Sequence, residues 1–159
     1  MKTFSYSVIR RLGIIGAVLA LGVALVACAQ PEPEVAEAPA NPLTGITWQW
    51  VSLTQQPGGM ATEIVQPANY TLVLNQDGTL SGRADCNNFS GTYSQTNGFT
   101  ISLGATTAAA CGEGSLDQQY LGLLATVVAG GPDGQGGLAL ENAGGENRML
   151  FSNGGAASN

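Results

Sequence analysis

The side chains that could perform acid–base or nucleophilic chemistry are few in this sequence. The chain has no histidine, so the commonest general base and the commonest metal ligand are both missing. Its one lysine is Lys2, which leaves no Ser–Lys pair further along, and no serine stands in a G-x-S-x-G context. Carboxylates remain, with Asp77, Asp85 and Glu113 as the candidate acid and base of an enzyme. Because nothing in their spacing brings two of them together, we predict that the protein is not an enzyme.

The same scarcity applies to metal and cofactor sites. Apart from the cysteines, metal ligands are limited to scattered carboxylates, and the sequence has no D-x-D-x-D-G calcium loop. We therefore predict no metal and no cofactor.

Cys28 ends an N-terminal segment with the organisation of a lipoprotein signal peptide. Basic residues within 1–11 precede an apolar run over 12–26, whose 15 residues fit a signal sequence and fall short of the about 20 that a membrane span needs. The run ends in Leu25-Val26-Ala27-Cys28, which resembles the bacterial lipobox. We predict cleavage after residue 27 and a lipid on the Cys28 thiol. The alternatives are an ordinary secretory signal with a chance cysteine and an uncleaved anchor.

A lipidated Cys28 predicts a domain that is anchored to the cell envelope and faces outward from the cytoplasm. Ala29 stands where an Asp usually retains a lipoprotein at the inner membrane, which favours the outer membrane if the source has two. Residues 28–42 form the lipidated Cys and a Pro- and Glu-rich tether without apolar periodicity. We expect one folded domain over 43–153 and a disordered tail over 154–159.

The charge of the processed chain limits its partners. Two basic and eleven acidic residues would remain, a net charge of −9. No basic patch is available to bind nucleic acid or an anionic membrane surface, and we predict no nucleic-acid partner. The acidity by itself indicates only solubility. The expected partners are the membrane, through the lipid, and a protein of the envelope.

Cys86 and Cys111 remain as a pair once Cys28 is assigned to the lipid. Export implies an oxidising compartment, which favours a disulfide between them. A metal site and a catalytic thiol are the alternatives. Two cysteines without histidine are too few for structural zinc, and a nucleophilic cysteine would lack a histidine base.

Most of the domain has the sequence pattern of β-strands. Runs of alternating, aromatic or β-branched residues, separated by turn residues, predict strands. These strands cover residues 46–53, 60–65, 70–75, 79–84, 89–95, 99–103, 138–141 and 148–152. Asp77-Gly78, residues 96–98 and Gly144-Gly145 predict the hairpin turns.

One segment has helical spacing instead. Ser115 followed by Gln118 has the pattern of a capping box, and apolar residues then recur every three or four positions up to Val127. The pattern predicts a helix over about 116–128 that ends at Gly130-Gly131-Pro132 and packs on the sheet.

Several of these motifs, taken in order, resemble the META domain family, also called HslJ-like. The motifs are Trp48, Ala84-Asp85-Cys86-Asn87, Gly91-Thr92-Tyr93, Thr107-Ala108-Ala109-Ala110-Cys111, the helix with Leu121 and Leu124, Leu138-Ala139-Leu140 and Met149-Leu150-Phe151. The resemblance covers about residues 43–152. It departs from the family pattern at Ala110, where a Met is frequent, and at Gly112, where some relatives have Pro.

The resemblance implies an α+β fold, a strongly curved, barrel-like antiparallel sheet with one packed α-helix. It also implies an envelope lipoprotein, an association with stress response and drug resistance, and no established catalytic residues.

The polar residues around Cys86 allow two interpretations. Asp85, Asn87 and Asn88 could hold a sharp turn by bonding to nearby backbone, or they could form a recognition patch beside the disulfide, together with Tyr93. Trp48, Trp50 and Tyr93 are more typical of core or sheet-face aromatics than of ligand stackers.

Taken together, the sequence predicts a non-catalytic binding or interaction module at the envelope. A carrier of small molecules or lipids, using a pocket in the curved sheet, is the alternative. A large apolar cavity would favour the carrier, and a filled core would argue against it.

Overall fold

Nine antiparallel strands and one α-helix build the part of the chain that the structure describes, residues 41–55 and 58–158 of a computed structural model. In chain order the elements are β1 Ile46–Gln55, β2 Ala61–Glu63, the 3-10 turn η1 Pro67–Asn69, β3 Tyr70–Leu74, β4 Thr79–Ala84, β5 Asn87–Ser94, β6 Thr100–Thr106, α1 Asp117–Leu124, β7 Val127–Pro132, β8 Leu138–Asn142, the 3-10 turn η2 Ala143–Gly145 and β9 Asn147–Ala156. The strands follow the order β6-β5-β4-β3-β1-β9-β8-β7 in one sheet, and β2 pairs with β1.

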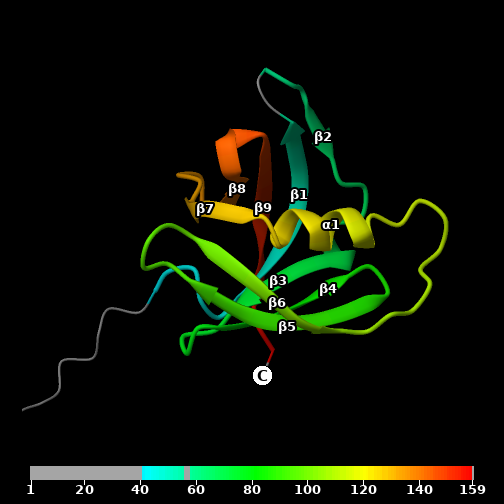
Figure 1. Ribbon diagram of the computed structural model, residues 1–159, viewed down its shortest axis with the longest axis horizontal. Helices are drawn as coiled ribbons and strands as arrows, with labels where there is room; N and C mark the ends of the chain where they lie inside the picture. Colours follow the sequence, from blue (N-terminus) through cyan, green and yellow to red (C-terminus); the bar gives the residue numbers. More distant parts are fainter. Residues whose placement is uncertain (1–40, 56–57, 159) are drawn as a thin grey trace, which may run out of the picture. The chain divides into compact units, whose positions relative to one another are not determined.

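This sheet curls into a half-barrel around the helix (Figure 1). Register shifts in β1, between Ile46 and Trp48 and between Trp50 and Ser52, bend the strand as β-bulges do. The two ends of the sheet then approach each other, and the Phe99 backbone N–H donates to the Val128 carbonyl at 3.1 Å. The structure therefore confirms the α+β class with a curved antiparallel sheet and one packed helix.

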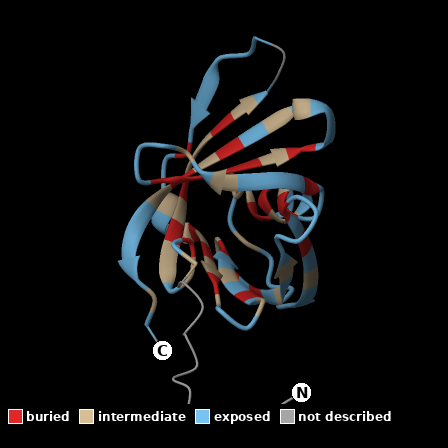
Figure 2. Cartoon of the chain, turned by 90° about the vertical axis from the view of Figure 1, so that its left-hand side faces the viewer, coloured by how far each residue is buried: buried red, intermediate tan, exposed pale blue. Residues whose placement is uncertain are grey.

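Large apolar side chains fill the inside of the curl. The buried residues lie along the strands and in α1 (Figure 2). Trp48 and Trp50 are buried, as expected for core aromatics, and Trp50 stacks on Tyr120 of α1 with ring centroids 5.1 Å apart. The other fully buried large side chains are Phe99, Phe151, Leu72, Leu74, Leu80, Leu124, Leu138, Leu140, Met149 and Asn87. The helix thus occupies the space that a ligand would need inside the sheet.

Local patterns explain most strands. In β3 the alternating Tyr70, Leu72 and Leu74 point into the core, and β4 has the predicted bounds Thr79–Ala84. Asp77 stabilises the turn that leads into β4, because its Oδ1 accepts the Thr79 backbone N–H at 2.9 Å and the Thr79 hydroxyl at 2.6 Å. The hydrogen bond from the Thr79 hydroxyl makes the larger contribution and the one from the Thr79 backbone N–H the smaller, and together they hold the pKa of Asp77 below its ordinary value.

The predicted helix over 116–128 is too long. The helix ends at Leu124, and Val127–Pro132, including the supposed stop signal, forms β7 against β8. The Asn142 side chain donates to the Leu123 carbonyl at 3.0 Å and so bonds one of the last carbonyls of α1. Gly130 permits close packing in β7, since a Cβ there would lie 2.9 Å from Phe99 Cγ. Pairing with β8 therefore overrides the helical spacing.

The capping box is also wrong. Ser115 Oγ accepts the Asp117 N–H at 3.2 Å, and the Gln118 side chain donates to Asp117 at 3.1 Å instead of reaching back to Ser115.

The C-terminal tail expected over 154–159 is wrong for its first residues. β9 continues to Ala156, which pairs with Ile46, and the Ala157 N–H donates to the Gly45 carbonyl at 2.9 Å. Gly154 and Gly155 carry no side-chain pattern that would predict this strand, and they lie at a register shift against β1, where the Gly155 N–H donates to Asn153 Oδ1 at 2.8 Å.

The predicted signal peptide, Cys28 and most of the tether lie outside the described residues. Within those residues, no helix is long and apolar enough to cross a membrane.

Candidate functional site

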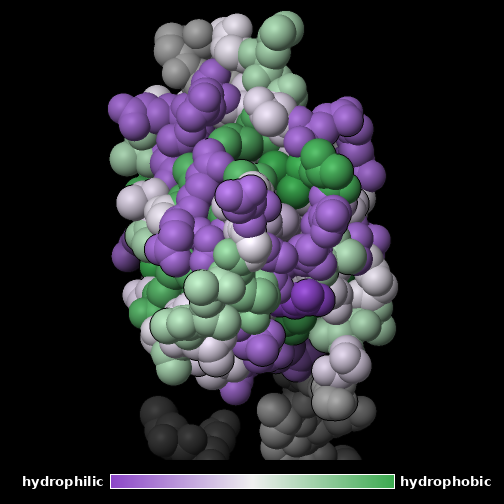
Figure 3. Space-filling model, turned by 90° about the vertical axis from the view of Figure 1, so that its right-hand side faces the viewer, coloured by the Kyte–Doolittle hydropathy of each residue, from purple (hydrophilic) through white to green (hydrophobic). Residues whose placement is uncertain are grey.

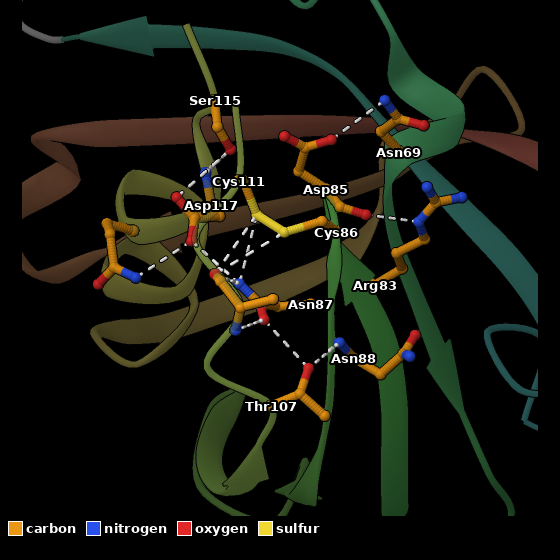
Figure 4. Close-up of a disulfide and its surroundings, with 12 residues drawn as sticks. Asn69, Arg83, Asp85, Cys86, Asn87, Asn88, Thr107, Cys111, Ser115 and Asp117 are labelled. Carbon is orange, nitrogen blue, oxygen red and sulfur yellow. Dashed lines mark hydrogen bonds between the residues drawn. A yellow bond between two sulfur atoms is a disulfide. The ribbon is translucent and has the colours of Figure 1, made fainter. Parts of the chain in front are cut away.

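The turn between β4 and β5 is the centre of the candidate site (Figure 4). Ala84 pairs with Asn87, so the hairpin loop is only Asp85-Cys86, and Asp85 has a φ of 55°. Two-residue hairpins favour such left-handed residues, and Asp tolerates them better than most. The Asp85 N–H donates to the Asn69 carbonyl at 2.7 Å, and Arg83 Nε donates to the Asp85 carbonyl at 2.5 Å. The turn is thereby fixed against η1.

A disulfide joins this turn to the segment between β6 and α1. Cys86 and Cys111 are bonded, with their Cα atoms 5.6 Å apart, which confirms the predicted pair. The cross-link closes a loop with a sequence separation of 25. Residues 107–116, which have no regular secondary structure, are thereby tied to the sheet.

Asn87, the residue after Cys86, is a buried hub. Its side chain is 2% exposed. Its Nδ2 donates to the Ala109 carbonyl at 3.1 Å and to Asp117 Oδ2 at 3.2 Å, and lies 3.4 Å from Cys111 Sγ. Its Oδ1 accepts the Ala109 N–H at 2.8 Å and the Thr107 hydroxyl at 3.1 Å. Asn87 therefore organises the cross-linked loop, which is the structural role that one of the two interpretations gave to this position.

Asp117 shares this network at the start of α1. Burial raises the pKa of its carboxyl, but hydrogen bonds from Gln118, Ser115 and Asn87 outweigh burial and hold that pKa below the ordinary value. An ionised carboxylate in the first turn also suits the helix dipole. The hub is consequently a charged, hydrogen-bonded anchor for the helix.

The proposed recognition patch does not exist as one surface. The exposed Asn88 uses its backbone, whose N–H donates to the Thr107 hydroxyl at 3.0 Å. Tyr93 lies near the far end of β5, about 17 Å from Asn88 at the rise of a strand. Its hydroxyl donates to the Asn75 carbonyl at 2.8 Å and its ring stacks on Phe99. Burial, with a smaller contribution from Asp77, raises the pKa of this hydroxyl. Tyr93 thus links β5 to the turn after β3 and to Phe99, the residue before β6.

A cleft opens on the other side of the disulfide. It has a volume of about 520 Å³ and lies between the β2–η1 segment and the loop that leads to α1. Its lining consists of Glu63, Ile64, Val65, Gln66, Asn69, Tyr70, Asp85, Gly112, Glu113, Gly114, Ser115 and Leu116. Because Glu63, Asp85 and Glu113 contribute to it, we call it the acidic cleft.

The acidic cleft corrects one sequence-based conclusion. Asp85 and Glu113, which the spacing did not bring together, line the same hollow, and Glu63 joins them. In the sequence, only the predicted disulfide indicated that Asp85 and Glu113 lie close together, since it places the residue before Cys86 near the residues after Cys111. Among the described residues no three His, Cys, Asp or Glu side chains are grouped closely enough to hold a metal ion.

The face of the molecule that contains the segment after β6 is turned to the viewer in Figure 3. Hydrophilic side chains surround a few strongly hydrophobic ones in its upper half. A second hollow, of about 450 Å³, lies beside Asn87 and is lined by uncharged residues, including Leu103, Leu121 and 106–110. Of these two hollows, the acidic cleft is the one that is lined by charged side chains.

Comparisons with known proteins agree with this geometry. The NMR structure of a protein from Burkholderia xenovorans is similar, with a TM-score of 0.55 and 25% identity over 78% of this chain and 96% of that one. The crystal structure of a DUF4847 family protein from Bacteroides vulgatus shares the fold, with a TM-score of 0.55 and 14% identity over 69% and 93% of the two chains. No functionally curated protein matches the sequence. The family model described as META domain matches residues 41–154, and the chain therefore belongs to the META domain family.

Proposed function

We propose that this META domain is a non-catalytic interaction module, displayed from the cell envelope by a lipid on Cys28, and that a partner binds in the acidic cleft. The observation that carries the proposal is the cleft itself, because it is both chemically distinctive and held in shape. The stress and drug-tolerance associations of the family resemblance belong to this proposal as further expectations.

Three constraints hold the walls of the acidic cleft in place. The Asp85 N–H donates to the Asn69 carbonyl, the Leu116 N–H donates to the Tyr70 hydroxyl at 2.9 Å, and the disulfide ties the loop to the sheet. A preformed site loses less conformational entropy on binding than a mobile one. These constraints support a binding role.

The side chains of the acidic cleft support the absence of catalysis. Glu63 and Glu113 are exposed to solvent, whereas a carboxyl that acts as a general acid is normally shielded in an apolar pocket. The hydroxyl of Ser115 lies 3.3 Å from Asp117 Oδ1 and also accepts the Asp117 N–H, so it is occupied in the helix anchor. The lining contains no histidine, lysine or free thiol to activate a nucleophile.

The filled core argues against the carrier alternative. Trp50, Tyr120 and Phe151 occupy the inside of the curved sheet and are almost fully buried. Among the described residues, the two hollows lie at the edges of the domain, beside the disulfide-linked loop.

Two measurements test the proposal in cells. First, Cys28→Ser should abolish labelling with radioactive palmitate and release the protein from membranes, and equal labelling of the variant would refute the anchor. Second, a photo-crosslinking residue at Gln66, in the cleft lining, should give discrete adducts, whereas the same residue at the exposed turn position Thr96 should give none. Equal adducts at both positions would refute the cleft as the binding site.

The proposal also fails if the purified protein turns over a substrate. A hydrolase activity that Asp85→Asn or Glu113→Gln abolishes without unfolding the domain would show that the carboxylates are catalytic.

A further inference from the structure

We propose that the occupant of the acidic cleft is an extended, Lys- or Arg-bearing segment of a partner protein, which adds as a strand to the free edge of β2. This inference rests on the proposed function and specifies its partner. Its starting point is the pairing of β2, which joins β1 on one side and no other described strand on the other.

The backbone of β2 offers hydrogen bonds to such a strand. Leu53 is opposite Thr62, and the Ile64 N–H donates to the Val51 carbonyl at 2.9 Å. Because hydrogen-bonded and non-hydrogen-bonded pairs alternate in an antiparallel ladder, Thr62 bonds to β1, and the N–H and C=O groups of Ala61 and Glu63 face the open side. This open side is an edge suited to strand addition.

The sheet topology places the added strand in the cleft. β9 occupies one side of β1 along its length, so β2 and β3 share the other side, opposite residues 52–54 and 47–49. β4 lies beside β3 and ends at Ala84, opposite Tyr70. A strand beside β2 would therefore continue the line of β4 beyond the Asp85 turn, which is where the acidic cleft lies.

The charges around this position favour a cationic occupant. Glu63, Asp85 and Glu113 line the cleft. The domain has two cations, and neither is in the lining: Arg148 pairs with Glu141, and Arg83 bonds to the main chain of Asp85. Among the described residues neither Glu63 nor Glu113 forms an ion pair, so Lys or Arg side chains of a bound strand would meet these two carboxylates without a competing protein cation.

Two exposed apolar residues flank β2 and add to the surface. Met60 and Val65 are each 92% exposed, and Val65 is part of the cleft lining. Because alternate side chains of a strand point to opposite faces, Glu63 points to the face opposite the buried Ile64, and a bound strand would place cationic residues on the Glu63 face and apolar residues on the Ile64 face. The matching sequence is an alternation of cationic and apolar residues.

Charge repulsion also disfavours occupants from this chain. The tether carries Glu32, Glu34 and Glu37, so it would be repelled by the cleft. A second copy of the processed protein would bring a net charge of −9. The partner is therefore a different, basic protein.

The test uses full-length lipoprotein in detergent micelles and three fluorescent nine-residue peptides. One alternates Lys and Val, one alternates Glu and Val, and one is the Lys/Val peptide with alternate backbone nitrogens methylated. Fluorescence polarisation should show binding of the Lys/Val peptide only, with the Glu/Val and N-methylated peptides weaker by about tenfold or more. Equal binding of the N-methylated peptide would overturn strand addition.

Matched variants locate the binding. Glu63→Gln/Glu113→Gln should weaken the Lys/Val peptide by about tenfold, while Glu141→Gln/Glu146→Gln, which removes the same charge elsewhere, should change it less than about twofold. Ala61→Pro should weaken it similarly, since it removes an outward N–H that β1 does not use. Equal effects of the two double variants would overturn the inference, and the N-methylated peptide tests the edge even if Ala61→Pro misfolds.

The outcomes separate the inference from the proposed function. Loss of the Gln66 crosslinks in cells would refute the function. Persistent crosslinks, together with peptide binding that is indifferent to N-methylation, would refute strand addition alone.

Discussion

The two sides of Cys86 use polar side chains in opposite ways. On one side, Asn87 is buried, and both the amide nitrogen and the amide oxygen of its side chain form hydrogen bonds to the loop or to Asp117. On the other, Asp85 accepts a bond from Asn69 at 3.3 Å and otherwise borders an open hollow with Glu63 and Glu113. The difference shows that neighbouring residues of one motif divide into a part that builds the local structure and a part that lines an open hollow.

The largest expected effect comes from the bond between the two sides. Replacing Cys86 and Cys111 together by Ala should lower the free energy of unfolding by about 2–5 kcal/mol, because the unfolded chain loses a cross-linked loop. Urea denaturation with and without a reductant measures this. A reductant that destabilises the double variant as much as the native protein would contradict the assignment of the effect to the disulfide.

Asn87 and Asn88 provide the sharpest contrast within the motif. Asn87→Ala should destabilise the domain by about 2–4 kcal/mol, since it leaves Asp117 and the Ala109 N–H and carbonyl without a buried partner. Asn88→Ala, at the exposed neighbouring position, should change stability by less than about 0.5 kcal/mol. Thermal or urea unfolding compares them, and similar losses in both would mean that Asn87 is not a hub.

Two tyrosines extend the comparison to the core. Tyr70→Phe removes the acceptor of the Leu116 N–H behind the cleft and should cost about 1–2 kcal/mol. Tyr120→Phe should instead stabilise the domain by about 1 kcal/mol, because its buried hydroxyl has no hydrogen-bond partner among the described residues. Burial likewise raises the pKa of Tyr120. Denaturant midpoints decide the sign, and a destabilised Tyr120→Phe protein would reveal a missed partner.

The smallest expected effect concerns the charge of Asp117. Hydrogen bonds lower its pKa in the folded state, despite burial, so its contribution to stability is complete above the ordinary value of about 3.9 and is lost as the pH falls through the folded-state value. Asp117→Asn should flatten the pH dependence of stability below about pH 4. Glu146→Gln, which removes a carboxylate at an exposed position outside this network, is the control. If Asp117→Asn left the slope of stability against pH unchanged, the charge of Asp117 would not contribute to the stability of the network around Asn87.

The sequence predicted those parts of the fold whose cause is local. The alternation in 70–74 and the turn at Asp77-Gly78 specify a hairpin without help from the rest of the chain. The end of α1 was missed because β8 recruits Val127–Pro132 into the sheet, and the end of β9 was missed because its glycines carry no side-chain pattern. Both errors come from contacts with distant strands.

The site was predictable only in its covalent part. Pairing Cys86 with Cys111 followed from the redox compartment, and the family resemblance pointed to the same motif. The burial of Asn87 depends on where residues 107–117 return to the sheet, and the cleft depends on where β2 and η1 lie. Side chains from four separate segments meet there, and no spacing within one segment signals such a meeting.

The long pairing of β1 has a mechanical consequence. Its first residues adjoin the tether, and its last residues carry β2, so a pull between a membrane anchor and a bound partner would pass along this strand. β9 on one side, with β3 and β2 on the other, would then be loaded parallel to their axes, and the bonds that cross the strand would share the force instead of breaking one after another. A module that holds a partner under a pulling force at the cell surface would resist unfolding better if that force ran along its most extensively paired strand.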